Sequence, residues 1–368
     1  MLEGSKMFGK GEKRVINNFE LMHEDDIVLK LDYDELGIEI LNNSKLPFSL
    51  REKEVLDRAD VLNWVSYRVF FSKRTYMDKL YIARKVGRDQ QKVLADSSAI
   101  SIIDNFWIKR PDTKRNWKQI QVLRDMNKDL MEVVLEGKIS TRLLVEKFED
   151  MTSLYTVKGM FPKMIYAGRL FKKGFNAEYE VIGYEIAKSL GIKVAEAEYV
   201  SNDIVSCVLF TNIDVSMCHI SDLLYLTNYD FNGNPCQAIY EYVVENGELS
   251  LKKDLERLYT LAYITSNLDL VNNSENFGLL YDPKTFNFTE VAPAYDFNNA
   301  FYVPDEEYGI GYFDEWILNN LPVFIENNRD ILDKIPETLK VVEDFKHLTN
   351  NQKDCVSYRL NNILNLER

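Results

Sequence analysis

Three polar side chains in the second half of the sequence, Asp269, Asn276 and Asp296, have the types and the order that phosphoryl transfer uses. That reaction needs Mg²⁺ held by hard oxygen ligands and a carboxylate that orients the attacking hydroxyl group. The turn sequence Asp282-Pro283-Lys284-Thr285 separates two alternating runs, which we expect to pair as a hairpin. Asn276 begins the first strand and Asp296 follows the second, so both should lie at the same end of the hairpin. Asp269, which we expect to follow a helix, would join them there.

A lysine and several glutamates precede this segment. Residues 169–172 alternate as a strand that ends in Lys172, and residues 178–190 have the pattern of a helix that is closed by Gly191. The alternation with Leu170 places Lys172 on the face opposite Lys173. The predicted helix carries three glutamates that could pair with this lysine: Glu178, Glu180 and Glu185.

The segment before that strand is a candidate phosphate-binding loop. It contains Ser153, Thr156, Lys158, Gly159 and Lys163, with a single glycine. Backbone N–H groups near Gly159 could cradle a phosphate, and Lys158 or Lys163 would add positive charge. A simple surface turn explains the same residues equally well.

Taken together, Asn267-x-Asp269, Asn276-Phe-Gly and Ala-Pro-x-Tyr-Asp296 resemble the catalytic and metal-binding segments of HipA-like serine/threonine kinases. Asp296-Phe-Asn298 also resembles the Asp-Phe-Gly sequence of ordinary protein kinases, and asparagine is the next-best residue where glycine adopts a left-handed conformation. The sequence departs from the family pattern in two ways. Asp269 and Asn276 are seven residues apart instead of the usual five, and the histidine common in that loop is absent.

The resemblance implies a role for each matching residue. Asp269 would orient the substrate hydroxyl and accept its proton, while Asn276 and Asp296 would bind Mg²⁺. Lys172 would steady the phosphates of ATP, and the match at the helix end selects Glu180 as its partner.

Two other asparagines, Asn272 and Asn273, are candidate metal ligands by distance along the chain. They fall in the apparent insertion, where a polar loop tip is the simpler interpretation. Only Asn276 directly precedes the predicted strand 277–280. We therefore expect Asn276 to be the asparagine that binds Mg²⁺.

The resemblance also implies an overall organisation and a function. We expect an α+β, bilobal protein-kinase-like fold with an accessory region (1–145), a strand-rich N-lobe (146–213) and a helical C-lobe (214–368). The implied activity is ATP- and Mg²⁺-dependent phosphorylation of serine or threonine in a protein, with a DNA-binding antitoxin as a possible partner. Ser153 or Thr156 would be a site of autophosphorylation. The alternatives are a small-molecule kinase and a pseudokinase that acts as a binding module.

The first 140 residues contain no candidate catalytic group. Residues 19–40 alternate like a small antiparallel sheet. Ser49-x-x-Glu52 is a capping-box pattern, which predicts a helix with Ala59 and Leu62 on one face, and further helix is expected to about residue 106. After a break at residues 110–112, helices are predicted again over 117–135.

Composition limits the classes of function. The 368-residue chain carries a net charge of −13, which argues against general nucleic-acid binding. Residues 68–128 carry 15 Lys/Arg against 6 Asp/Glu, so this basic segment could be a docking surface or only a solvated helix face. The four cysteines and three histidines lack zinc-ligand spacing. With no apolar run long enough for a bilayer, we expect a cytoplasmic protein.

Overall fold

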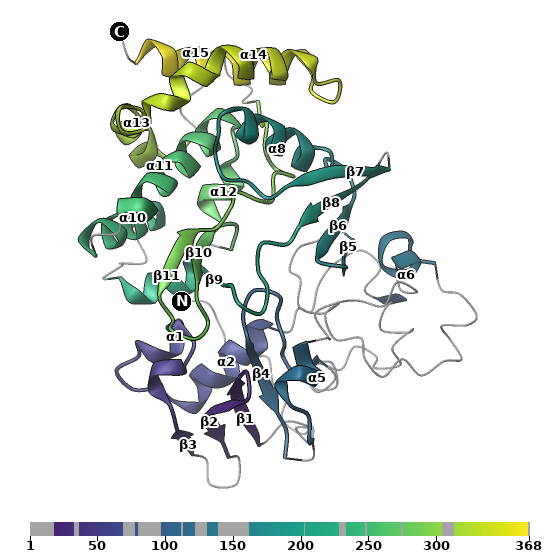
Figure 1. Cartoon of the computed structure of the whole chain (residues 1–368), viewed down its shortest axis with the longest axis vertical. Helices are drawn as coiled ribbons and strands as arrows, with labels where there is room; N and C mark the ends of the chain where they lie inside the picture. The colour runs from purple at the N-terminus through teal and green to yellow at the C-terminus, as the bar shows by residue number, and fades with distance from the viewer. Residues whose placement is uncertain are drawn as a thin grey trace.

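The computed structural model combines helices with antiparallel sheets, which confirms the expected α+β class. It describes residues 18–32, 37–68, 78–79, 97–111, 113–121, 131–138, 162–201, 203–227, 233–246, 249–273, 275–303 and 313–366. In Figure 1 the N-terminal sheet lies at the bottom and the C-terminal helices lie at the top. Within the described ranges, no helix combines the length and the apolar composition that crossing a bilayer requires.

The N-terminal sheet has the strand order β3-β2-β1-β4. The sheet predicted from residues 19–40 is confirmed as β1 (Phe19–His23), β2 (Asp26–Leu31) and β3 (Ile38–Ile40). β4 (Phe106–Lys109) pairs with β1 and was not predicted. Its pairing partner is far away along the chain, so no local pattern indicates it.

The helix predicted from the capping box at Ser49 does not begin there, although a later helix lies within the predicted stretch. α1 (Phe48–Arg51) already contains Ser49 and ends at Arg51, and the buried Ser49 hydroxyl has no hydrogen-bond partner in the described part of the chain. α2 (Arg58–Arg68) follows as a separate helix and buries Val61 and Val65. The predicted face with Ala59 and Leu62 is therefore not the buried one. α5 (Trp117–Gln121) and α6 (Met131–Glu136) lie within the helical range predicted after the break.

The second sheet has the order β5-β6-β8-β7 and presents different residues on its two faces. Its strands are β5 (Lys163–Tyr166), β6 (Arg169–Lys173), β7 (Ala197–Ser201) and β8 (Ile204–Val208). On one face, Met164, Phe171 and Ile204 pack into the core of the N-terminal region, which includes residues of α6. On the opposite face, Lys163 lies directly across from Lys172.

The predicted helix 178–190 is confirmed as α8 (Tyr179–Ser189), and Gly191 follows it with the left-handed φ of 68°. The rest of the described chain is mostly helical. Its helices are α9 (Ile220–Leu223), α10 (Pro235–Glu245), α11 (Leu249–Ile264), α12 (Leu268–Asn272), α13 (Glu315–Asn327), α14 (Ile335–Asp344) and α15 (Asn350–Asn365), with short 3₁₀ turns between some of them. α8 and these helices share one large hydrophobic core.

The predicted hairpin forms the third sheet, β11-β10-β9, together with one earlier strand. It consists of β10 (Gly278–Tyr281) and β11 (Phe288–Val291), and β9 (Ser216–His219) pairs with β10. At the hairpin tip Phe286 is buried against rings of the N-terminal region. Its ring centroid lies 5.0 Å from that of His23, 5.8 Å from that of Phe48 and 6.2 Å from that of Phe106. The hairpin is thus anchored in the N-terminal region at its tip.

Candidate functional site

A buried lysine between two carboxylates is the centre of the site. Lys172 Nζ donates to Glu180 Oε1 at 2.6 Å and to Asp296 Oδ1 at 3.0 Å. Lys163 Nζ lies 3.9 Å from the other Asp296 oxygen, Oδ2. The side chains of Lys172 and Glu180 are only 8% and 3% exposed, so this pair is withdrawn from water. β6, α8 and the segment after β11 therefore meet at one point.

Close packing fixes the carboxylate on that last segment. Asp296 has a left-handed backbone with φ of 65°, and the ring of the next residue, Phe297, is buried. That ring lies against Gly183 of α8, where an added Cβ would come within 2.3 Å of it. Glycine at this position lets α8 approach closely enough for Glu180 and Asp296 to share one lysine.

The electrostatics of this cluster differ for its two carboxylates. Burial raises the pKa of Asp296, but Lys163 and Lys172 outweigh it and hold that pKa below its usual range. Burial raises the pKa of Glu180 in spite of the Lys172 charge. The pKa of Lys172 lies above its usual value, because Asp296 and Glu180 outweigh the effect of burial. Asp296 is therefore the carboxylate most firmly kept ionised, as a cation ligand should be.

A second cluster surrounds Asp269. Asn276 Nδ2 donates to Asp269 Oδ2 at 2.8 Å and to the Asp269 backbone carbonyl at 3.3 Å. Asn299 Nδ2 donates to the same Oδ2 at 3.1 Å. Within the described part of the chain, Asp269 Oδ1 accepts no hydrogen bond. One carboxylate oxygen is thus held by two amides, while the other is available to a substrate.

The local structure around Asp269 differs from the prediction in one respect. Asp269 follows α11, as expected, but it lies in the first turn of a further short helix, α12. Asn267 caps that helix by accepting from Leu270 N, and its Nδ2 donates to the Asp296 backbone carbonyl at 3.4 Å. Asn276 folds back onto Asp269 although the two positions lie seven residues apart. Asn267 also connects the two clusters.

The residues present suit Mg²⁺. Because Asn276 turns its amide nitrogen toward Asp269, its carbonyl oxygen is left for a cation. Asp296 supplies an ionised carboxylate, and hard oxygen atoms are the ligands that Mg²⁺ prefers. The buried Oδ1 of Asn298, two residues after Asp296, has no partner among the described residues, so a further oxygen acceptor lies close by in the chain.

The structure brings most of the predicted site residues together. Lys172 pairs with Glu180, and neither Glu178 nor Glu185 is its partner in the described structure. The predicted loop residues Ser153, Thr156, Lys158 and Gly159 lie outside the described residues. Sequence reasoning missed Asn299, because an asparagine beside other asparagines in a turn carries no distinguishing signal.

Part of the predicted basic segment has a structural use. Arg68 donates both Nη1 and Nη2 to Asp104 at 2.7 Å, and both side chains are buried. Arg68 is therefore not part of a surface. Lys114 and Lys118 are exposed, while much of 68–128 lies outside the described residues.

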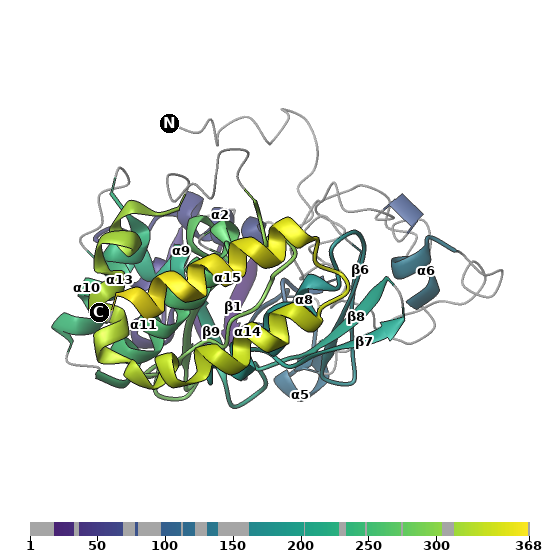
Figure 2. The ribbon, with the colours of Figure 1, turned by 90° about the horizontal axis from the view of Figure 1, so that it is seen from above.

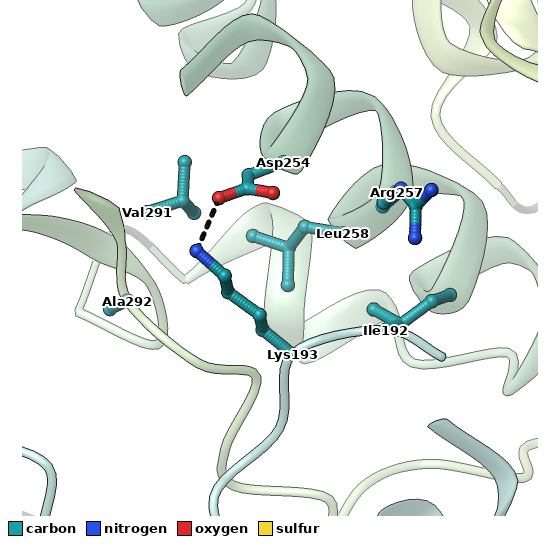
Figure 3. Close-up of a pocket in the computed structure, with 7 residues that line it drawn as sticks. All are labelled: Ile192, Lys193, Asp254, Arg257, Leu258, Val291 and Ala292. Carbon is teal, nitrogen blue, oxygen red and sulfur yellow. Dashed lines mark hydrogen bonds and ion pairs between the residues drawn. The ribbon is translucent and has the colours of Figure 1, made fainter. Parts of the chain in front are cut away.

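A small pocket lies apart from these two clusters (Figure 3). Three parts of the chain line the pocket. They are the loop after α8 (Ile192 and Lys193), α11 (Asp254, Arg257 and Leu258) and the end of β11 with the next residue (Val291 and Ala292). Lys193 Nζ donates to Asp254 Oδ2 at 2.8 Å and to Glu290 Oε2 at 3.1 Å. Arg257 Nη2 lies 2.7 Å from Asp330 Oδ1, so both cations of the pocket wall are neutralised, and none of the predicted site residues lines the pocket.

No family model and no curated protein sequence matches the chain. Among solved structures, it is similar to HipA in a complex with HipB and operator DNA from Shewanella oneidensis MR-1. The identity is 14%, the TM-score is 0.55, and the match covers 95% of this chain and 96% of that one. The Helicobacter pylori proinflammatory kinase CtkA matches with 16% identity, 55% and 88% coverage and a TM-score of 0.37, which is too low to support an argument. The chain thus has the fold of HipA over nearly its whole length.

Proposed function

We propose that this chain, which has the fold of HipA, is a kinase that transfers the γ-phosphoryl group of ATP to a serine or threonine of a protein with the help of Mg²⁺. The observation that carries the proposal is the buried Lys172, which binds Glu180 from a helix and Asp296 from the end of a hairpin. This geometry resembles the lysine–glutamate pair and the metal-binding aspartate of protein kinases. A purely structural ion pair needs only one carboxylate.

We assign the lobes from the same arrangement. The sheet β5-β6-β8-β7 with α8 would be the N-lobe, within the proposed limits 146–213. The helices and the β9–β11 sheet that follow would be the C-lobe (214–368), and residues 1–145 the accessory region. β9 supports the boundary between residues 213 and 214, because it pairs with β10 of the β10–β11 hairpin and not with the N-lobe sheet.

The catalytic residues would act mainly by positioning and charge. Asp269 presents its unoccupied Oδ1 to the substrate hydroxyl and accepts the proton as the hydroxyl attacks. Asn276 and Asp296 would hold Mg²⁺, which would supply charge neutralisation for the phosphate oxygens. Lys172 would contact the ATP phosphates while Glu180 keeps it in place. Lys163 faces the same region and adds a second positive charge.

Phosphotransfer tests the proposal directly. The protein is incubated with Mg²⁺-ATP and a bacterial protein extract, and with a small-molecule pool as a second acceptor set. We expect labelled protein, and we expect Lys172→Ala, Asp269→Asn and Asp296→Asn each to lower the rate by roughly 10²-fold or more. Lys173→Ala is the matched control, because Lys173 is on the other face of β6 and pairs with Asp203.

Three outcomes would refute parts of this assignment. Full activity in Asp296→Asn would exclude the kinase mechanism, and label found only in small molecules would exclude a protein substrate. Binding of Mg²⁺-ATP without any transfer would identify a pseudokinase instead.

The metal ligand can be tested by calorimetry. We expect Asn276→Ala to weaken Mg²⁺-nucleotide binding far more than Asn272→Ala or Asn273→Ala. Asn276 is joined to Asp269 and precedes the strand that pairs back toward Asp296. Equal losses in the three variants would contradict the assignment.

We also propose a DNA-binding antitoxin as partner, with the exposed part of 68–128 as the docking surface. The HipA complex with HipB and operator DNA supports the kind of partner. Binding through this segment should weaken steeply with salt, and charge reversal at Lys114 and Lys118 should reduce it. An affinity unchanged by these reversals would leave the segment as a solvated surface.

A further inference from the structure

The C-terminal helices hold α8 on its side away from the N-lobe sheet. α14 packs on α8, and Figure 2 shows α14 and α15 running beside each other across this side of the molecule. Lys334 Nζ, just before α14, donates to the Leu190 carbonyl at 3.2 Å. Ser189 Oγ and Thr338 Oγ1 are hydrogen-bonded at 2.8 Å. The helix that carries Glu180 is therefore tied to the C-terminal end of the chain.

One side chain of α15 connects α8 directly to the segment that follows Asp296. Gln352 Nε2 donates to Tyr179 Oη at 2.8 Å and to the Phe301 carbonyl at 3.2 Å. Tyr179 directly precedes Glu180, and its ring meets the Phe301 ring edge to face at 5.1 Å. A single carboxamide thus binds both segments that supply a carboxylate to Lys172.

Phe301 extends this connection to the helix that precedes Asp269. Its backbone has the left-handed φ of 62°, and its N–H donates to the Thr265 carbonyl at 2.7 Å. Thr265 directly follows α11 and lies four residues before Asp269. Gln352, Phe301 and Thr265 therefore form a hydrogen-bonded chain that reaches all three segments of the site.

We propose that Gln352 is a positioning residue for phosphoryl transfer, which fixes α8 relative to the 296–301 segment so that Glu180 and Asp296 engage Lys172 together. The inference rests on the proposed kinase function for its catalytic consequence. α15 thus connects these two segments within the chain itself.

The chemistry of the carboxamide makes the proposal specific. Both partners of Nε2 are oxygen atoms, one of them a carbonyl that can only accept, so the site needs an NH₂ group with two donors. The other end of the side chain has a separate use: Oε1 accepts from Thr349 N at 2.9 Å, and Thr349 and Gln352 together form the capping box of α15. Helix capping and bridging are therefore separable by mutation.

Two variants separate the capping of α15 from the bridging by the Gln352 NH₂ group. Gln352→Glu keeps a capping-box residue at this position of α15 but removes both donors. Thr349→Ala removes the capping hydroxyl but leaves the Gln352 NH₂ group in place. We expect Gln352→Glu to lower kcat at least roughly tenfold, because a small displacement of catalytic groups is costly. The KM for the protein substrate should stay the same. Thr349→Ala should lower the unfolding midpoint and leave kcat near the wild-type value.

Amide hydrogen exchange of the unliganded protein provides a readout that does not depend on activity. Gln352→Glu should speed exchange in α8 and in residues 296–301, whereas Thr349→Ala should speed it only near the start of α15. If the wild-type protein transfers no phosphate, the kinase function fails, but the exchange pattern still decides whether Gln352 couples the two segments. Wild-type exchange in Gln352→Glu would overturn the coupling. Faster exchange with an unchanged kcat in an active enzyme would overturn the positioning role.

Discussion

Asp296→Asn and Glu180→Gln each remove one of the two carboxylates that bind Lys172, and we expect them to differ in stability. With an effective dielectric constant of about 20, the attraction is about 6 kcal/mol between Lys172 and Glu180 at 2.6 Å and about 5.5 kcal/mol between Lys172 and Asp296 at 3.0 Å. Lys163 adds about 4 kcal/mol for Asp296 at 3.9 Å. Asp296 therefore gains about 10 kcal/mol from two lysines, against about 6 kcal/mol for Glu180.

Both carboxylates also lose hydration when they are buried, and this cost decides the sign of the net effect. For Glu180 burial raises the pKa, so the folded protein gains little from its charge. For Asp296 the attraction of Lys163 and Lys172 exceeds the effect of burial, so its pKa falls below the usual value. We expect Asp296→Asn to lower the free energy of unfolding by about 3–5 kcal/mol, as for a broken buried ion pair. Glu180→Gln should change it by about 1 kcal/mol or less, because Lys172 keeps Asp296 as its partner.

Urea unfolding at pH 7 of the two isosteric variants and the wild type measures this difference. Phosphotransfer should fall in both variants, so activity and stability would be separated in Glu180→Gln alone. An equal loss of stability in the two variants, or a larger loss in Glu180→Gln, would refute the assignment of Asp296 as the firmly ionised group.

Three further predictions concern single residues. Burial lowers the pKa of His23 from 6.5 to about 4, so the unfolded chain binds the proton first as the pH falls. The free energy of unfolding should then drop by up to about 3 kcal/mol between these two pH values, and His23→Phe should remove this dependence in urea unfolding across pH. Gly183→Ala should cost about 1–3 kcal/mol in a thermal melt and reduce phosphotransfer, because the new methyl group would displace the Phe297 ring. Asn299→Ala should lower kcat roughly tenfold in steady-state assays without changing the calorimetric Kd for Mg²⁺-ATP, because Asp269 would lose one of two amide donors.

The parts of the site that could be predicted from the sequence are those with local signals. The turn 282–285 and its flanking alternation place the hairpin, and Gly191 marks the end of α8. The alternation of residues 169–172 predicts β6 with Lys172 near its end, and the structure places this lysine across from Lys163. The fold comparison confirms the resemblance at the level of the fold, while the roles of the individual residues stay predictions.

The rest depends on contacts between distant residues. Gln352 reaches Tyr179 across 173 positions of the sequence, and no local pattern encodes that contact. Asn299 becomes notable only once α12 has turned Asp269 toward it. Ser49 has the local pattern without the predicted structure. Its spacing to Glu52 fits a capping box, but the side chain is buried inside α1 and does not begin a helix.

The anchoring of the hairpin tip has a consequence for biosynthesis. The N-terminal region leaves the ribosome well before the hairpin, so its strands can pair before the hairpin is made. When Phe286 emerges, its ring can pack against the rings of His23, Phe48 and Phe106. A polypeptide started at an internal initiation codon beyond β4 would have every proposed catalytic residue. It would lack the three rings that Phe286 packs against at the hairpin tip. Such a product should be made without being able to align its metal ligands, so the N-terminal region is itself a condition for activity.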